Sequence, residues 1–575
     1  MRHDTTTKRE ALASVMGQLE KILPMLASDK VGEVANAASR IVHVLAKVKL
    51  DLHDLVLLLK EEPVRHQSNS SPFETDQEAL VRFGSTAKYF LNSAREVFAD
   101  IMVSGHRETW PLASAQYSEW LTQRFWVDKD RIPAPVQLKS VIQLLRARAL
   151  FSTSQRHDVH LRVAEFEAKI YLDLADESWR AVEIDAEGWR VIDAPPVRFR
   201  RTAAMQPLPN PVRGGTIDEL RQFVNLNESD FLLSVAFALD TLRVGRPHPV
   251  LYLAGGEGTA KSTLTQILGS LIDPHRLKLR RLPNVRDLFV AAHNQSILCF
   301  DNVSGIAADT SDALCQITSG AGFAKRKNYT DGEEFQVAGA HPVILNGIEN
   351  CIDRPDLADR AIVLNLPRVD PARRRPEAEF WAAFENARPR LLGALLDIAV
   401  HGLANAAQVG TSELARVADF QRWALACETA FSAPGAFMRA FANNTTATVE
   451  GLIDGDPVAK AITAFMLDRR NWHGTAAELL SELTRHDQTE ARVSRLPTWP
   501  RDPARLSKAL RAMQPTLTKA GITIEFDKAV DRRRTRTVKI WNRATNDGPC
   551  DRPGSHDDGQ RITEANAPRP EARTA

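Results

Sequence analysis

The segment PVLYLAGGEGTAKSTLTQILGSLI, residues 249–272, determines the fold around which the rest of the sequence must be arranged. It begins with an apolar run, passes through a glycine-rich turn that ends in Lys261 and Ser262, and continues with helical periodicity. This strand–loop–helix order is the context that a Walker A loop requires, because glycines let backbone N–H groups converge on phosphate oxygens. The predicted loop residues are Gly255, Gly256, Glu257, Gly258, Thr259, Ala260, Lys261, Ser262 and Thr263.

The loop residues have distinct predicted roles. We expect Lys261 to reach the β- and γ-phosphates of ATP, and the hydroxyl of Ser262 to bind Mg²⁺. The position before the lysine is usually glycine, and here it is Ala260. We expect this position to open the helix with right-handed dihedrals, which alanine tolerates. The loop therefore predicts two cofactors, ATP and Mg²⁺.

Residues 216–370 alternate predicted strands and helices around this loop. Four apolar runs suit strands that are buried on both faces of a parallel sheet, namely PVLYLA, SILCF, PVILN and AIVLN. The predicted fold class is an α/β P-loop NTPase core with a parallel sheet. We expect an N-terminal helical region, a small antiparallel β domain and a C-terminal winged helix beside it.

An acidic residue follows the second of these apolar runs. Asp301 fits a Walker B aspartate that binds Mg²⁺, and the plainer alternative is an ordinary acid at a strand end. Many helicase and ring ATPases have a second acid next, whereas this chain has Asn302, which can orient a water but cannot accept its proton. Either another acid activates the attacking water or hydrolysis is slow. The candidate acids are Asp309, Asp312 and Glu349.

The order of motifs after Asp301 is more specific than any single motif. A predicted helix leads to a glycine-rich turn, then to the basic residues Lys325, Arg326 and Lys327, and then to a strand that ends at Asn346. Over residues 216–370 this order resembles the superfamily-three helicase core, a branch of the AAA+ ATPases. The match is to the helicase half of phage- and plasmid-type primase-helicases.

The resemblance implies a role for each of these residues. Asn346 would be a sensor that hydrogen-bonds the γ-phosphate or the attacking water. Arg360 would be a finger that completes the site of a neighbouring subunit, with Arg354 as the second choice, so the resemblance implies a homo-oligomeric ring. The basic residues 325–327 would contact single-stranded DNA in a central channel. The plainer alternatives are a strand-end cap for Asn346, a structural ion pair for Arg360 and a solvated turn for the basic residues.

Residues 456–543 form a separate predicted module. Helical segments precede two short strands joined by a charged turn, an order that predicts a winged helix. The stretch 501–543 has a net charge of +8, whereas the whole chain has only +2. We expect this module to bind duplex DNA, and the alternative is a protein partner. The predicted DNA contacts are Arg505, Lys508, Arg511, Arg532, Arg533, Arg534 and Arg536.

The rest of the chain is divided by periodicity and composition. Trp179 and Trp189 lie in alternating segments of a predicted antiparallel meander, where we expect them to be core anchors rather than base-stacking platforms. The segment that precedes the meander has helical periodicity. The predicted domains are a helical element at 1–60, an α+β domain with the meander at 79–202, the core at 216–370, a helical subdomain at 371–450, the winged helix at 456–543 and a disordered tail at 544–575.

Composition excludes several classes of protein. Hydrophobic residues make up 43% of the chain and charged residues 25%, which is ordinary for a globular protein. The five cysteines include no CxxC pair, which argues against a disulfide framework and a structural zinc site. The N-terminal MRHDTTTKRE is followed by no apolar region, and no apolar run is long enough for a membrane span. We therefore expect a cytoplasmic protein with no membrane partner.

The leading hypothesis is an ATP-dependent DNA helicase or translocase of phage or mobile-element type that moves on single-stranded DNA. No primase motif is evident upstream, so a separate primase is an expected partner. The alternative is a DNA-binding AAA+ switch, such as an initiator, regulator or defence protein, that uses ATP for assembly; Asn302 favours it. A third hypothesis is a DNA-binding scaffold with a vestigial nucleotide site, against which the intact Lys261, Ser262 and Asp301 argue.

Overall fold

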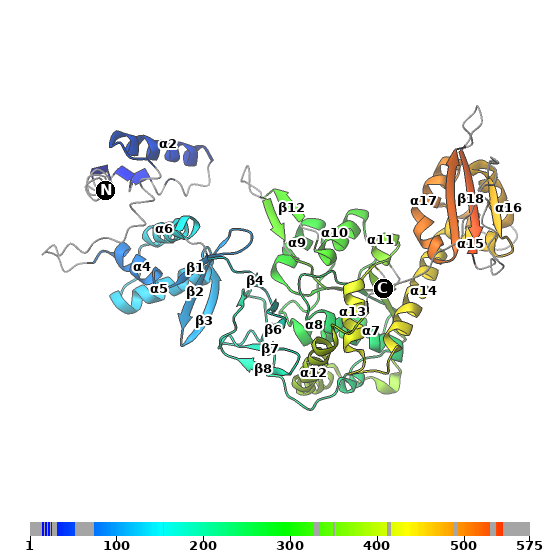
Figure 1. Cartoon of the computed structure of the whole chain (residues 1–575), viewed down its shortest axis with the longest axis horizontal. Coiled ribbons are helices and arrows are strands. Elements are labelled where there is room, and N and C mark those ends of the chain that lie inside the picture. Colours follow the sequence, from blue (N-terminus) through cyan, green and yellow to red (C-terminus); the bar gives the residue numbers. More distant parts are fainter. Residues whose placement is uncertain are drawn as a thin grey trace, which may run out of the picture. The chain divides into compact units, whose positions relative to one another are not determined.

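A computed structural model of the chain is shown in Figure 1, and it divides into two compact units, Met1–Leu452 and Ile453–Ala575. None of the helices that the structure describes is long and apolar enough to cross a membrane. The described residues are 14–15, 18–19, 21–22, 25, 31–51, 74–152, 155–320, 323–326, 334–337, 339–348, 351–410, 416–487, 493–528 and 536–543.

A four-stranded parallel sheet forms the centre of the first unit, with the strand order β11-β14-β10-β15. These strands are the four predicted apolar runs, and nearly all their side chains are buried. The mixed α/β class with a parallel sheet is therefore confirmed. The strands are β10 (Val250–Ala254), β11 (Leu298–Phe300), β14 (Val343–Gly347) and β15 (Ala361–Asn365).

Helices connect and cover these strands. The helix α8 (Lys261–Ile272) follows β10 directly, and seven of its residues are buried. A two-stranded antiparallel pair, β12 (Phe323–Arg326) and β13 (Glu334–Val337), follows α10, and β12 contains Lys325 and Arg326 of the predicted basic residues. The other helices of this region are η2 (Ile217–Gln222), α7 (Glu228–Asp240), α9 (Val285–Asn294), α10 (Ala308–Ser319) and α11 (Pro355–Ala358).

The region after the sheet is helical, as predicted. A 3₁₀ turn, η3 (Pro371–Arg373), precedes the long helix α12 (Glu377–Asn405), and α13 (Ala418–Glu428) and α14 (Ala436–Gly455) follow. Buried residues of α12 and α13 belong to the same hydrophobic cluster as those of β10 and α8. The helices therefore share one core with the sheet.

The predicted meander is present as the antiparallel sheet β5-β6-β7-β8, and a short parallel pair, β4 with β9, lies beside it in sequence. Trp179 and Trp189 are buried, as expected for core anchors. Val163, Ile170 and Val182 of the meander belong to the cluster that contains the parallel sheet. The meander therefore shares the hydrophobic core of the parallel sheet. Its strands are β4 (Val159–His160), β5 (Val163–Phe166), β6 (Lys169–Asp173), β7 (Ala181–Ile184), β8 (Trp189–Ile192) and β9 (Arg198–Phe199).

The segment before the meander differs from the sequence expectation, which was helical throughout. Between its helices lies a three-stranded antiparallel sheet, β1 (Lys88–Leu91), β2 (Val97–Val103) and β3 (His106–Pro111), joined at its second turn by Ser104-Gly105 with positive φ. Its own core is a separate cluster. Its helices are α4 (Asp76–Gly84), α5 (Ala115–Lys129) and α6 (Pro135–Ser152), and α2 (Val31–Lys47) precedes them.

The described residues of the second unit form the helices α15, α16 and α17 and a three-stranded antiparallel sheet in the order β16-β18-β17. The hairpin β17–β18 was predicted, whereas the short strand β16, with the sequence NWHGT, was not. The predicted tail at 544–575 lies outside the described residues. The elements are α15 (Pro457–Met466), β16 (Asn471–Thr475), α16 (Ala476–Asp487), η4 (Val493–Arg495), α17 (Pro503–Lys519), β17 (Ile522–Lys528) and β18 (Arg536–Asn542).

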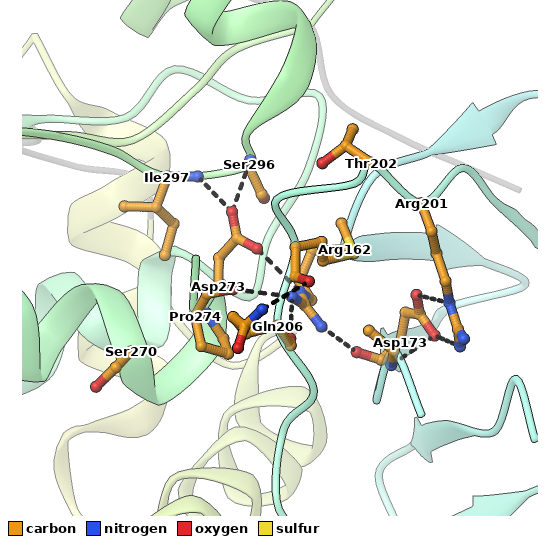
Figure 2. Close-up of polar contacts among 12 residues, drawn as sticks. Arg162, Asp173, Arg201, Thr202, Gln206, Ser270, Asp273, Pro274, Ser296 and Ile297 are labelled. Atoms are coloured by element: carbon orange, nitrogen blue, oxygen red, sulfur yellow. Dashed lines mark hydrogen bonds and ion pairs between the residues drawn. The ribbon is translucent and has the colours of Figure 1, made fainter. Parts of the chain in front are cut away.

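A buried ion pair fastens the amino edge of the parallel sheet to the meander (Figure 2). Nε of Arg162 lies 3.0 Å from Oδ1 of Asp273, and the two side chains are 0% and 2% exposed. Arg162 also donates to the backbone oxygens of Asp173 and Gln206. Asp273 follows the last residue of α8, and its Oδ2 accepts the N–H groups of Ser296 and Ile297, just before β11. We call Arg162, Asp273 and these backbone partners the amino-edge network.

Candidate nucleotide site

The glycine-rich loop leaves β10 at the carboxyl edge of the sheet and turns tightly into α8. Gly258 and Ala260 have φ angles of +75° and +64°. A Cβ on Gly255 would lie 2.8 Å from the carbonyl oxygen of Leu366, so only glycine fits there without a shift. The expectation of right-handed dihedrals at Ala260 is wrong. This residue is the N-cap of α8 in the left-handed region, which explains why glycine is usual there.

Lys261, the first residue of α8, folds back over the loop. Its Nζ donates to the carbonyl oxygens of Gly255 at 2.6 Å and Gly256 at 2.7 Å. Partial burial lowers the pKa of its ammonium group, and the nearby carboxylates of Asp301 and Glu257 oppose that shift. The ammonium therefore lies within the loop, in reach of any anion that the loop binds.

Ser262 and Asp301 meet at the head of α8, although 38 residues separate them in the chain. Oγ of Ser262 donates to Oδ1 of Asp301 at 2.8 Å. A hydroxyl and a carboxylate are oxygen ligands of the kind that Mg²⁺ prefers, together with waters and phosphate oxygens. The donor set therefore fits one magnesium ion beside a nucleotide phosphate chain.

Asn346 lies at the end of β14 and is buried. Its Oδ1 accepts the backbone N–H of Asn302 at 3.1 Å, and its Nδ2 donates to Oγ1 of Thr265 at 2.9 Å. Asn302 itself is exposed and has a φ of +57°. The side chain of Asn346 thus connects the turn after Asp301 to α8, so a shift of that turn would be transmitted to the loop helix.

Two of the three candidate acids already have partners. Oδ1 of Asp309 accepts the N–H of Thr310 at 2.8 Å, in the first turn of α10. Asp312 forms an ion pair with Arg354 at 2.8 Å. Glu349 lies outside the described residues. A cavity of about 400 Å³ borders Asn302 and is lined also by Arg281, so this side of the turn is open to water.

Arg360 precedes β15 at the amino edge of the sheet, opposite the loop. Its carbonyl oxygen accepts the N–H of Val250, the first residue of β10. The five-residue strand separates the two edges by about 16 Å, so Arg360 is poorly placed to act on a nucleotide in its own subunit. Asp356 pairs with Arg354 at 3.3 Å and Asp359 with Arg416 at 3.7 Å.

Two arginines that the sequence interpretation did not select lie beside the loop. They belong to the segment LPRVDPARRR, residues 366–375, which follows β15. A Cβ on Gly258 would lie 3.9 Å from Nη2 of Arg374 and 4.0 Å from Nε of Arg368. The only signal in the sequence was the excess of arginine in this segment, which does not by itself indicate where the segment lies.

The residues selected for nucleic-acid contact lie on two separate elements. Lys325 and Arg326 are in β12, whereas Lys327 and Arg532 to Arg534 lie outside the described residues. On α17, Arg505, Lys508 and Arg511 are all exposed. The guanidinium of Arg511 stacks over Phe526 of β17, with Cζ 3.9 Å from the ring centroid. Arg536 begins β18 opposite Lys528, so the described part of the module carries exposed cations on both helix and hairpin.

The sheet, the glycine-rich loop and the Ser262–Asp301 pair define a mixed α/β protein with a candidate phosphate-binding site. Comparison with protein families is more specific. Residues 217–445 match the family described as actinomycete integrative conjugative element replication protein. Residues 458–553 match the C-terminal domain of the replication protein RepA of the same elements. Over these two regions the chain is similar to replication proteins of integrative conjugative elements.

Solved structures and curated proteins give weaker matches. The structure titled "SCCmec type IV Cch - active helicase" is 13% identical, with a TM-score of 0.40, and the match covers 79% of this chain and 93% of that one. The apo C-terminal region of NrS-1 is 12% identical, with a TM-score of 0.36, over 82% of this chain and 99% of that one. No curated protein matches the sequence.

Proposed function

We propose that the chain is an ATP-dependent DNA helicase or translocase that acts in the replication of an integrative mobile element. The observation that carries the proposal is the 2.8 Å contact of Ser262 with Asp301 beside Lys261, at the point where a glycine-rich loop enters α8. The proposal is supported because an ammonium group, a hydroxyl–carboxylate pair and the backbone N–H groups of a glycine-rich loop are the groups that would surround a bound phosphate chain. The match to replication proteins supports DNA as the second substrate.

The chain's own residues divide the proposed reaction between them. Lys261 would leave the loop carbonyls and bind phosphate oxygens, while Ser262 and Asp301 would hold the magnesium ion, which would balance charge on the transferring phosphoryl group. Asn346 hydrogen-bonds the turn that carries Asn302 and also Thr265 of α8, so it couples the position of that turn to the helix that follows the loop. Arg360, at the opposite edge of the sheet, acts on the nucleotide of a neighbouring subunit, which makes the active form a homo-oligomeric ring of AAA+ type.

The DNA contacts are proposed on two surfaces. Lys325, Arg326 and Lys327 follow the phosphates of single-stranded DNA in the channel of the ring. The second unit is proposed to be a winged helix, because a helix with three exposed cations precedes a basic hairpin. Its α17 and hairpin bind duplex DNA mainly through phosphates, since arginine and lysine dominate the surface.

A second candidate function is an ATP-dependent assembly switch, as in an initiator. The exposed Asn302 beside Asp301 favours it, because no carboxylate takes the proton of the attacking water at that position. The two candidate acids within the described residues have other partners, which would slow hydrolysis further. The two functions differ in whether single-stranded DNA stimulates turnover and whether a duplex is unwound.

The test compares the natural protein with Lys261→Ala in ATP hydrolysis, with and without single-stranded DNA, and in unwinding of a forked duplex. We expect DNA to stimulate hydrolysis and Lys261→Ala to abolish it while the thermal unfolding midpoint stays unchanged. Lys139→Ala is the matched control, because this exposed lysine lies on α6, whose buried residues belong to a separate hydrophobic cluster, and it should leave basal hydrolysis intact. Undiminished hydrolysis by folded Lys261→Ala would remove the proposal, and hydrolysis without unwinding would favour the switch.

A further inference from the structure

A short segment after β15 is fastened directly to the glycine-rich loop. We call residues 366–375 the arginine strap. The N–H of Leu366 donates to the carbonyl oxygen of Ala254 at 2.8 Å, and the N–H of Val369 donates to that of Gly258 at 3.0 Å. Nδ2 of Asn225, a residue outside the strap, donates a hydrogen bond to the carbonyl oxygen of Pro367 at 2.6 Å. These bonds fix the position of the strap's backbone relative to the tip of the loop.

The strap brings two guanidinium groups to that tip. Arg368 and Arg374 both approach Gly258, whose lack of a side chain leaves the space into which they extend. Both side chains are exposed, and neither forms an ion pair with a carboxylate in the described part of the chain. Arg354 of the same unit, by contrast, forms an ion pair with Asp312 at 2.8 Å.

Unpaired cations placed around converging N–H donors favour a multiply charged anion. Lys261 is the third cation at the same loop, and Glu257, the loop's only carboxylate, forms no ion pair with any of them within the described residues. Arginine suits this task because its planar donors bind two phosphate oxygens at once. The geometry therefore suits a triphosphate chain better than an isolated phosphate.

We propose that Arg368 and Arg374 bind the polyphosphate chain of the nucleotide in their own subunit, and that the arginine strap makes ATP binding independent of the neighbouring subunit. This inference rests on the proposed nucleotide site. It assigns phosphate binding to residues of the same chain and leaves Arg360 to act in trans on turnover alone. A subunit that is not part of a ring is then already competent to bind ATP.

The test measures dissociation constants for Mg²⁺·ATP by fluorescence of a labelled analogue, with inorganic tripolyphosphate as the competitor. The variants are Arg368→Gln, Arg374→Gln and Arg375→Gln. The last is the matched control, because Arg375 is an exposed neighbour in the same segment whose side chain does not approach Gly258 within 4 Å. We expect each of the first two to weaken binding of both ATP and tripolyphosphate by roughly 10- to 100-fold, and the control to change neither by more than about twofold.

The failures of the two proposals are distinguishable. If Lys261→Ala loses ATP while Arg368→Gln and Arg374→Gln bind it as the natural protein does, the strap proposal is overturned and the nucleotide site stands. If the variants lose ATP but keep tripolyphosphate, the arginines do not bind phosphate, which also overturns it. If the natural protein binds no nucleotide, both proposals fall. Recovery of affinity in Arg374→Lys at an unchanged unfolding midpoint would support a charge contact over a packing role.

Discussion

Charged residues are buried and paired at the amino edge of the parallel sheet, whereas two arginines at its carboxyl edge are exposed and form no ion pair in the described part of the chain. At the amino edge, Arg162 and Asp273 are almost fully buried, and the hydrogen bonds of both are directed at fixed partners within the chain. At the carboxyl edge, Arg368 and Arg374 are exposed beside Gly258, with no carboxylate paired to them in the described part of the chain. Burying a charge without a partner costs free energy, so each buried charge at the amino edge needs the other, and the pair has a structural role. Cations left unpaired next to a loop of N–H donors are instead available to a ligand.

Arg360 differs from the other charged residues named at the amino edge, because it has no ion pair in the described part of the chain. It lies at the amino edge, yet its Nε is buried without a hydrogen-bond partner in the described chain. Its neighbours Asp356 and Asp359 are engaged by Arg354 and Arg416. Arg360 shares with Arg368 and Arg374 the lack of an ion pair in the described part of the chain, but it is only partly exposed and lies at the edge opposite the loop. In the proposed ring, a neighbouring subunit would present its loop to that edge, which would give the guanidinium of Arg360 a partner.

The largest expected effect is therefore that of Arg360→Ala on turnover. A finger arginine is worth about 10³- to 10⁵-fold in kcat, so we expect a loss of this order with ATP affinity unchanged. Steady-state hydrolysis and nucleotide titration on the same preparation measure the two quantities. Mixing Arg360→Ala with Lys261→Ala subunits should restore part of the activity, since the second variant supplies an intact finger to the loop of the first.

Arg354→Ala serves as the control for that experiment. Its guanidinium pairs with Asp312 and Asp356 on its own chain, so its loss should affect stability more than kcat. A loss of turnover confined to Arg354→Ala would transfer the finger role to Arg354. Normal hydrolysis by a monomeric Arg360→Ala protein would contradict the shared site.

The next largest effect should come from Arg162→Met, which breaks the amino-edge network. Removing one partner of a buried ion pair typically costs about 3–5 kcal/mol, because Asp273 would remain buried and charged. We expect the urea midpoint of the first unit to fall accordingly, while the protein that remains folded binds ATP normally.

An exposed pair gives the reference for that measurement. Arg390→Met removes the ion pair with Glu219 at 2.8 Å, where water can replace the lost contact. Its midpoint should change far less than that of Arg162→Met. Equal shifts for the two variants would show that the amino-edge network contributes no more than a surface contact, and the comparison of the two edges would lose its basis.

Local patterns in the sequence were sufficient to predict the centre of this fold. Each parallel strand is a continuous apolar run, and the glycines of the loop stand between a strand and a helix. The sheet β1–β3 was missed because Asp100, in the middle of β2, interrupts the apolar pattern. In the structure Asp100 is buried against Arg198 at 3.0 Å and Thr109 at 2.7 Å. A buried acid with partners far along the chain cannot be distinguished from an exposed one by periodicity.

The residues of the candidate site that lie within local motifs could be selected from the sequence, and those that depend on the folded arrangement of the chain could not. Lys261, Ser262 and Asp301 were selected from motif spacing, and the structure brings Ser262 and Asp301 into contact at the head of α8. Arg368 and Arg374 could not be selected, because their place beside Gly258 depends on the chain returning along β10 through β15. The conformation of Ala260 could not be predicted from the motif either. A shift of one residue in the start of α8 changes Ala260 from the first helical residue to the N-cap, and the motif does not fix that start.

The smallest expected effect concerns Ala260 and tests the carboxyl edge at a single residue. With φ of +64° and ψ of +28°, it lies in the left-handed region, which costs an alanine roughly 1 kcal/mol relative to glycine. Ala260→Gly should relieve this cost, less the greater entropy that glycine has in the unfolded chain. We expect a slightly higher urea midpoint for the first unit and a nearly unchanged ATP affinity, because glycine adopts this left-handed conformation without strain and adds no side chain to the loop. Ala260→Val should lower the midpoint, since a β-branched residue tolerates positive φ poorly. The opposite order, with valine tolerated and glycine destabilising, would mean that this position opens α8 with right-handed dihedrals, as its place in the motif had suggested.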